Sequence, residues 1–272
     1  MDNVIKRYEV RHPFLRNYIK FFWEFCVDNI TLDHSIISSR NINLRFNLSD
    51  FPICLSSNKI QFPLDKVFFS GFHNRHSNSS FKFSGKMHML GVCFYPDGFF
   101  PFIGIPLNEF KNGVAGPEDI GIHELRNIYK KLRDSKDINQ RLMILEEELL
   151  LMYKVHDHHN EFRGLYSAFQ KFHQESNISL FCKENGLNIR KLERMFDKYI
   201  GVSAKTFLGI DRFQKSVNQL LYSDYNRLSD IAYENGYFDQ MHFIREFKKF
   251  TSRTPRNFIS ANNSMFQVGK FV

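Results

Sequence analysis

Hydrophobic and polar residues alternate along parts of the first 120 residues, which is the period of a β-strand with one buried face. Residues 41–48 alternate without interruption. Clusters of Gly, Asn and Ser that indicate turns separate the further predicted strands, at residues 51–55, 67–69, 80–83 and 87–95. Several short strands with turns between them predict a small barrel or sandwich. The opening apolar stretch, Leu15–Phe25, fits either a helix or a strand.

From about residue 122 the spacing of apolar residues lengthens to that of helices. They recur every three or four positions around residues 125–132 and again around residues 142–152. Two helices are therefore expected, which either mediate dimerisation and signal transfer or cover the β-rich domain. The polar run Lys154–Asn160 is interpreted as a link to the region that follows.

The last third of the chain contains an internal repeat. Residues 179–186 (SLFCKENG) recur 50 residues later as residues 229–236 (SDIAYENG), with an identical Glu-Asn-Gly triplet. After a one-residue slip, the similarity resumes at a spacing of 51, where Phe196 matches Phe247 and Phe207 matches Phe258. Two copies of one structural unit are therefore present.

Each copy has the pattern of a helix, a tight turn and a second helix. Serine, asparagine and aspartate cap helix starts by accepting backbone hydrogen bonds, and glycine adopts the left-handed conformation that ends a helix. A glycine turn before a polar-faced helix is typical of the helix-turn-helix, whose second helix enters the DNA major groove. The expected residues are Ser179 and Ser229 as first caps, Gly186 and Gly236 as turns, and Asn188 and Asp239 as second caps.

The stretch between the two units predicts a connecting helix of useful length. Residues 206–222 are apolar on one side and would form a rod of roughly 26 Å. With the ends of the units added, the two second helices would lie about 34 Å apart, which is one turn of B-DNA. Both could then enter successive major grooves on one face of a duplex.

Candidate DNA contacts are the side chains that these helices leave facing outward. Arginine pairs with guanine, glutamine with adenine, and methionine contacts the thymine methyl group, whereas contacts to phosphate position the protein without specifying sequence. The candidates for base contact are Arg190, Lys191 and Arg194 in the first unit and Gln240, Met241, His242 and Arg245 in the second. The candidates for phosphate contact are Lys198, Lys205, Lys248, Lys249, Arg253 and Arg256.

The charge distribution favours a polyanionic partner for this region. The 272 residues carry a net charge of +8, and residues 161–272 alone hold 17 Lys and Arg against 11 Asp and Glu. Charge by itself does not separate DNA from RNA or an anionic membrane. No stretch approaches the roughly 20 apolar residues of a membrane span, and residues 1–14 lack the apolar segment of a secretory signal. A cytoplasmic protein without a membrane partner is expected.

Histidine and cysteine patterns do not predict a metal site or an enzyme. His73, His76 and His88 lack the paired His-x-His spacing of a metal-binding cupin, and the cluster at residues 156–159 falls in the predicted link. The four cysteines stand alone and are expected to be small buried core residues in a reducing compartment. No catalytic triad or phosphate-binding glycine loop is discernible. We expect no catalytic residue, cofactor or metal.

Residues from about 163 to 261 resemble the tandem helix-turn-helix domain of the AraC/XylS family of bacterial transcription regulators. The stretches that carry the resemblance are LERMFDKYIGVSAKTF, RFQKSVNQLL, LSDIAYENGYFDQMHFIREFKKF and TPRNFI. The sequence departs from the family pattern at Met241, where Ser is usual, and at Ser252, where Gly is usual. The N-terminal 160 residues are similar, less specifically, to the sensory half of some members. The resemblance implies DNA binding that a ligand or a partner regulates.

The predicted protein is α+β and has four parts. These are a β-rich, barrel- or sandwich-like regulatory domain (1–122), a helical linker that is a candidate for dimerisation (123–160), an AraC-type tandem helix-turn-helix domain (161–261) and a tail (262–272). The expected function is sequence-specific transcription regulation through double-stranded DNA. Further expected partners are a small-molecule effector or a protein at the N-terminal domain, a second copy in a homodimer, and RNA polymerase for an activator. The alternatives are a protein-interaction module without specific DNA binding, and a DNA-binding regulator that a protein partner controls.

Overall fold

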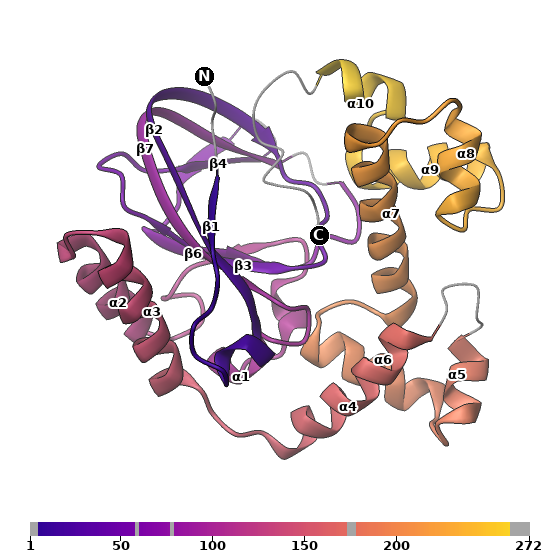
Figure 1. The fold of residues 1–272 in the computed structure, drawn as a ribbon, viewed down its shortest axis with the longest axis horizontal. Coiled ribbons are helices and arrows are strands. Elements are labelled where there is room, and N and C mark those ends of the chain that lie inside the picture. The colour runs from indigo at the N-terminus through magenta and orange to yellow at the C-terminus, as the bar shows by residue number, and fades with distance from the viewer. Residues whose placement is uncertain (1–4, 58–59, 77–78, 173–177, 262–272) are drawn as a thin grey trace.

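The computed structural model describes residues 5–57, 60–76, 79–172 and 178–261. Strands pair antiparallel in the first part of the chain, and from residue 124 onward the described residues form helices. This arrangement confirms the predicted α+β class with a helical C-terminal part. In Figure 1 the strands occupy one half of the molecule, and the later helices curve around the other half. The predicted tail, 262–272, lies outside the described residues.

The sheet is organised around two long strands, β2 and β7. The main path runs β1-β2-β7-β3-β6-β8, and the first part of β7 also pairs with β4, which pairs with β5. The inner face holds one apolar cluster that includes Trp23, Phe25, Phe68 and Met89. The strands are β1 (Lys6–Tyr8), β2 (Ile19–Ser35), β3 (Ile42–Asn47), β4 (Cys54–Ser57), β5 (Ile60–Pro63), β6 (Val67–Ser70), β7 (Ser79–Phe94) and β8 (Val114–Ala115).

Several strand predictions are confirmed and others are corrected. Strand β3 buries Ile42, Leu44 and Phe46 in strict alternation, as the pattern predicts. The two strands predicted at residues 80–83 and 87–95 are one continuous strand, β7, which passes through Gly85 at a φ of 119°. The stretch Leu15–Phe25, which fitted either a helix or a strand, contains a 3₁₀ turn at Leu15–Asn17 and then the start of β2.

Helices form the remainder of the described chain. They are α1 (Phe100–Ile103), α2 (Glu124–Asp134), α3 (Ile138–Met152), α4 (Asp157–Lys171), α5 (Ile178–Glu184), α6 (Ile189–Tyr199), α7 (Ala204–Tyr222), α8 (Leu228–Glu234), α9 (Gln240–Thr251) and α10 (Pro255–Ala261). The apolar faces of α2 and α3 are buried in the same core as the sheet, so these faces cover the β-rich region. Helix α4 begins at Asp157 and crosses residue 160, so the polar run interpreted as a link is largely the first turn of a helix.

One aromatic core joins the sheet to the helices. It includes Phe94 of β7, Phe162 of α4 and Phe196 of α6. The ring centroids of Phe100 and Tyr199 lie 4.8 Å apart, and this contact joins α1 to α6. Burying an aromatic side chain stabilises a fold by roughly 1.5–3 kcal/mol, so contacts of this kind fix the sheet region and the helical region against one another.

The structure gives the burial of the cysteines and bears on the possible presence of a metal site or a membrane span. Cys93 and Cys182 are buried as expected, whereas Cys26 is exposed and Cys54 is half-buried. Within residues 5–261, as far as the structure describes them, no group of three or more His, Cys, Asp or Glu is placed to hold a metal ion. No helix in the described ranges is both long enough and apolar enough to cross a membrane.

Ser252 ends α9 in the left-handed conformation, with a φ of 58°. This conformation costs a residue with a Cβ atom roughly 1–2 kcal/mol. We predict that Ser252→Gly raises the free energy of unfolding by about 1 kcal/mol, because glycine removes that cost but adds freedom to the unfolded chain. Urea unfolding measures the change. Ser223→Gly, at the extended end of α7, is the control and is expected not to stabilise; a less stable Ser252→Gly variant would contradict the prediction.

Candidate nucleic-acid interface

The first helix-turn-helix unit consists of α5, a turn at Gly186 and α6. Gly186 has a φ of 62°, and the Leu187 N–H donates to the Cys182 carbonyl at 2.8 Å. The Asn188 side chain accepts a hydrogen bond from the Arg190 N–H at 2.8 Å, which confirms the predicted cap of α6. Buried Phe196 anchors the inner face of α6 in the core.

The second unit, α8 to α9, repeats this geometry. Gly236 has a φ of 70°, and the Tyr237 N–H donates to the Ala232 carbonyl at 2.9 Å. The Asp239 carboxylate accepts a hydrogen bond from the His242 N–H at 2.6 Å, so the predicted cap of α9 is also confirmed. Helix α7 connects the two units, and both can be followed in Figure 1.

The asparagine of the repeated Glu-Asn-Gly triplet has the same role in both units. The side-chain amide of Asn185 donates to the Phe181 carbonyl at 2.9 Å, and that of Asn235 donates to the Ile231 carbonyl at 2.8 Å. Each of these carbonyls also accepts the backbone N–H of the same asparagine. The asparagine therefore reinforces the last turn before the glycine, where helical carbonyls lack regular partners.

The predicted serine caps are wrong. Ser179 is the second residue of α5, and Ser229 is the second residue of α8. At the start of α8 the Asp230 carboxylate, one residue after Ser229, accepts a hydrogen bond from the Arg227 N–H at 3.0 Å. The longer carboxylate reaches back to the backbone from inside the first turn.

Most candidates for base contact are exposed on the second helix of each unit. Arg190 and Arg194 are exposed on α6. Two candidates are instead held by the chain: Lys191 Nζ lies 2.6 Å from a carboxylate oxygen of Glu161, and half-buried His242 accepts the Phe238 N–H at its Nδ1, at 3.3 Å. The exposed candidates on α9 are Gln240, Met241 and Arg245.

The candidates for phosphate contact differ in their surroundings. Lys198 Nζ lies 5.7 Å from the ring centroid of Phe100 and 5.1 Å from that of Tyr199, so this ammonium packs where the sheet region meets α6. Lys249 Nζ lies 5.3 Å from the ring centroid of Phe250. All six candidates are exposed: Lys198, Lys205, Lys248, Lys249, Arg253 and Arg256.

Two exposed aromatic residues of the second unit were missed by the sequence analysis. Phe238 is 86% exposed in the turn before α9, and Tyr233 is 67% exposed on α8. Phe238 comes directly before the Asp239 cap and so lies beside the candidates Gln240 and Met241. Its signal in the sequence is an aromatic residue in the polar segment between two helices. An exposed apolar ring at that point can contact a thymine methyl group.

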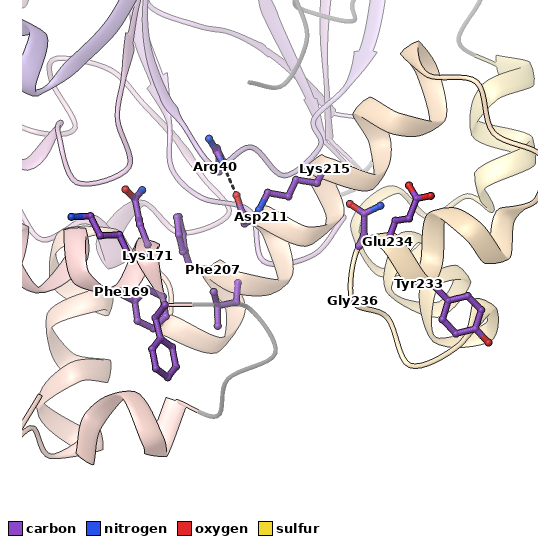
Figure 2. A pocket seen from close by; sticks show the side chains of 13 residues that line it. Arg40, Phe169, Lys171, Phe207, Asp211, Lys215, Tyr233, Glu234 and Gly236 are labelled. Carbon is purple, nitrogen blue, oxygen red and sulfur yellow. Dashed lines mark hydrogen bonds and ion pairs between the residues drawn. The ribbon is translucent and has the colours of Figure 1, made fainter. Parts of the chain in front are cut away.

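A cleft of about 740 Å³ is lined by the end of α4, by α7, by the second unit and by Arg40 of the sheet region. Arg40, from the segment between β2 and β3, forms an ion pair with Asp211 on α7, and Lys215 Nζ lies 3.0 Å from the same carboxylate (Figure 2). The second unit contributes residues 233–236 to the lining. The cleft therefore lies where the sheet region, α7 and the second unit meet.

Three hydrogen bonds join the sheet region to α7, which connects the two units, and to α6 and α9, which are the second helices of the units. The Gln214 side chain on α7 donates to the Ser38 carbonyl at 2.9 Å. The His76 N–H donates to the Lys249 carbonyl on α9 at 2.7 Å. The Asn108 amide donates to the Asp197 carboxylate on α6 at 2.8 Å. The N-terminal region thus contacts three helices of the DNA-binding part.

Helix α4 is fixed by a buried polar cluster at its first turns. His159 Nε2 donates to the Asp97 carbonyl at 2.8 Å, and the Asp97 carboxylate lies 3.0 Å from Arg163 Nε. Burial lowers the pKa of His159 to about 4, so the imidazole is neutral at pH 7. Burial also raises the pKa of Asp97, against the opposing effect of the Arg163 charge. The histidine run at residues 156–159 thus includes a residue that positions α4 on the sheet.

Two turn-linked helix pairs with outward arginines define a DNA-binding domain of the helix-turn-helix class. Residues 181–261 match a family described as a helix-turn-helix domain, and residues 11–115 match a domain of unknown function, DUF6597. Residues 181–261 are therefore an AraC-type helix-turn-helix domain, as the sequence resemblance predicted.

Several known proteins are similar to parts of the chain. An uncharacterised HTH-type transcriptional regulator of Staphylococcus aureus strain MSSA476 is 27% identical over 154 residues, which is 50% of this chain and 20% of that protein. The chain thus spans about one fifth of the length of the curated relatives it matches. The structure of ToxT from Vibrio cholerae O395 aligns with a TM-score of 0.46 at 12% identity, covering 90% of this chain and 97% of that one. The C-terminal domain of the response regulator YesN from Fusobacterium nucleatum aligns with a TM-score of 0.33 at 24% identity, covering 36% and 97%.

The depressed pKa of His159 predicts a loss of stability in acid. Its folded-state pKa of about 4 lies below the ordinary 6.5, so the unfolded chain binds the proton more tightly. The contribution of neutral His159 to the free energy of unfolding is complete above pH 6.5. It decreases as the pH falls towards 4, with a slope approaching about 1.4 kcal/mol per pH unit. His159→Gln keeps an N–H donor and removes the titration. Urea unfolding at pH 7, 6 and 5 measures the free energy of unfolding. We expect it to decline less steeply with falling pH in His159→Gln than in wild type or in the exposed control His158→Gln. Equal slopes would refute the lowered pKa of His159.

Proposed function

We propose that this chain is a sequence-specific transcription regulator that places α6 and α9 in successive major grooves of DNA. The observation that carries the proposal is the duplicated, capped unit, which leaves Arg190 and Arg194 exposed on α6 and Arg245 exposed on α9. The positive charge concentrated in residues 161–272 supports a polyanionic partner. Helix α7 sets the separation of the two second helices.

The exposed side chains divide by the chemistry they offer to a duplex. Arg190, Arg194 and Arg245 are assigned to guanine edges, and Gln240 to an adenine edge. Met241, 59% exposed, and Phe238, three positions earlier in the chain, are assigned to thymine methyl groups. The exposed lysines and arginines outside these positions neutralise phosphates and set the salt dependence of binding.

The double variant Arg190→Ala/Arg245→Ala tests the groove assignment. We expect its affinity for a duplex selected by the wild-type protein to fall at least about 30-fold, because each base contact contributes roughly 1–3 kcal/mol. Fluorescence anisotropy with that duplex and with a scrambled duplex measures the loss and its specificity. Lys130→Ala/Arg133→Ala on α2 removes the same charge from exposed positions and is the control. Equal losses in both double variants would contradict the assignment.

We also propose that the N-terminal region restrains DNA binding through its contacts with the helices. Lys198 packs on Phe100, and the last turn of α9 accepts the His76 N–H. Arg40 is paired with Asp211 of α7, and both residues line the cleft. These contacts tie both units to the sheet region, and we propose that this docked arrangement binds DNA more weakly than one in which the contacts are released.

Arg40→Met tests this restraint. The variant removes the ion pair across the cleft but leaves Asp211 paired with Lys215, so the helical region stays folded. We expect DNA affinity to rise about fivefold, at the lower end of typical coupling between sites. Arg126→Met is the control, because its ion pairs with Asp65 and Glu118 lie away from the helical units. Unchanged or reduced affinity in Arg40→Met would refute the restraint.

A further inference from the structure

Helix α9 of the second unit is held on α7 by a largely buried ion pair. Arg212 Nη2 on α7 lies 2.7 Å from Oε2 of Glu246 on α9, and the two side chains are only 23% and 21% exposed. Glu246 directly follows Arg245, which is a candidate for base contact. The pair therefore joins the connecting helix to the second helix of this unit, one residue away from a candidate DNA contact.

The same guanidinium also contacts the turn between α8 and α9. Its central carbon lies 4.7 Å from the ring centroid of Tyr237, which is buried and directly follows Gly236. The Tyr237 ring packs in turn on Phe243 of α9, with 5.1 Å between the ring centroids. Because a cation is attracted to the face of an aromatic ring, Arg212 connects three elements of the second unit, which are α7, the turn and α9.

The place of Glu246 on α9 makes this ion pair sensitive to rotation of the helix. Residues three or four positions apart lie on the same side of an α-helix. Glu246 lies three residues after buried Phe243 and four before buried Phe250, so it borders the buried side. Met241 and Arg245, four positions apart, share the exposed side. A rotation of α9 that moved these two side chains would therefore also move Glu246 away from α7.

Stability alone does not account for this ion pair. Removing two charges from water offsets most of the attraction between them, so a buried pair often adds little to stability compared with apolar side chains of similar volume. Arg212 Nε is in addition buried without a hydrogen-bond partner among the described residues. Charges that a domain keeps despite this cost can select one arrangement of its elements. Here the selected arrangement is the placement of α9 on α7.

The first unit holds its second helix by a different kind of pair. There the preceding helix, α4, contributes Glu161, which pairs with Lys191 on α6, and these side chains are 51% and 42% exposed. Exposed pairs of this kind contribute little and are screened by salt. The residue that matches Glu246 at the repeat spacing of 51 is Met195, which is buried and apolar. The first unit therefore serves as an internal reference for the effect of the Arg212–Glu246 pair.

We propose that Arg212 and Glu246 are positioning residues for base recognition by α9, because their ion pair fixes the rotation at which α9 meets the major groove. Base edges are distinguished by hydrogen bonds of defined geometry. Such contacts discriminate between bases only when supporting residues hold them in one orientation. Without the pair, α9 takes a range of rotations and accepts more sequences. This inference rests on the proposed function, since it requires that α9 enters the groove.

The double variant Arg212→Met/Glu246→Met tests the proposal. It removes both charges, so neither is left unpaired and the net charge of the chain is unchanged. Fluorescence anisotropy with the selected duplex and its single-base-pair variants measures discrimination in each of the two sequence blocks that the wild-type chain selects. The block read by α9 is the one in which Arg245→Ala loses discrimination. In that block we expect discrimination to fall about tenfold in the double variant, and in the other block to stay within about twofold of wild type.

Two further variants separate positioning from other effects. Lys131→Met/Glu148→Met removes an ion pair between α2 and α3, so it is the matched control and is expected to discriminate like wild type. Glu246→Gln keeps an oxygen that accepts from Arg212, and its discrimination in the α9 block is expected to stay within about threefold of wild type. Unchanged discrimination in the α9 block of the double variant, an equal loss in both blocks, or an equal loss in the control would overturn the proposal. A loss in Glu246→Gln as large as that in the double variant would also overturn it.

Thermal unfolding measures whether the pair is needed for the fold. The double variant is expected to unfold within about 4 °C of wild type, because apolar side chains replace the two charges. A midpoint more than about 10 °C lower would overturn the proposal by giving the pair a structural role. Failure of the wild-type chain to select any motif would refute the proposed function, whereas a selected motif that the double variant reads like wild type would refute this inference alone.

Discussion

The aromatic core that continues from the outer face of the sheet into the helices determines where every functional side chain lies. Phe100 of the sheet region packs on Tyr199 of α6, and Phe72 packs on Phe207 of α7. Because the inner faces of α6 and α7 are fixed in this core, the outer face of α6 must present its arginines to solvent. The many phenylalanines of the chain, 31 in all, therefore serve a shared interior more than a set of separate pockets.

Most of the features that depend on near neighbours could be predicted from the sequence, although the serine caps at Ser179 and Ser229 could not. The caps Asn188 and Asp239 and the turns Gly186 and Gly236 follow from hydrogen bonds and backbone angles within a few residues. Features that depend on distant partners could not be predicted. The buried His159 donates to the Asp97 carbonyl, 62 positions earlier in the chain. Strand β7 continues through Gly85, which pairs with Ile30 of β2. The exposed Phe238 was missed because periodicity identifies buried faces and not exposed contacts.

Two residues of the second unit have an unusual backbone conformation or an unusual exposure, and both lie next to candidate DNA-contacting residues. Ser252 takes a left-handed conformation at the end of α9, and Phe238 is an apolar ring in solvent. Residues that break the preferences of local structure are expected at functional or strained sites. The Arg40–Asp211 ion pair joins the segment between β2 and β3 to α7, and the proposed restraint acts through this contact.

Selection of duplexes from a random-sequence pool by the full chain, at two salt concentrations, tests the central claim most directly. Two helices in successive major grooves predict an enriched motif with two conserved blocks about ten base pairs apart. The motif should persist at the higher salt concentration, because base contacts add to phosphate contacts. Retention of duplexes without enrichment, lost steeply as salt rises, would mean phosphate contacts alone and would contradict the account in favour of a protein-interaction role.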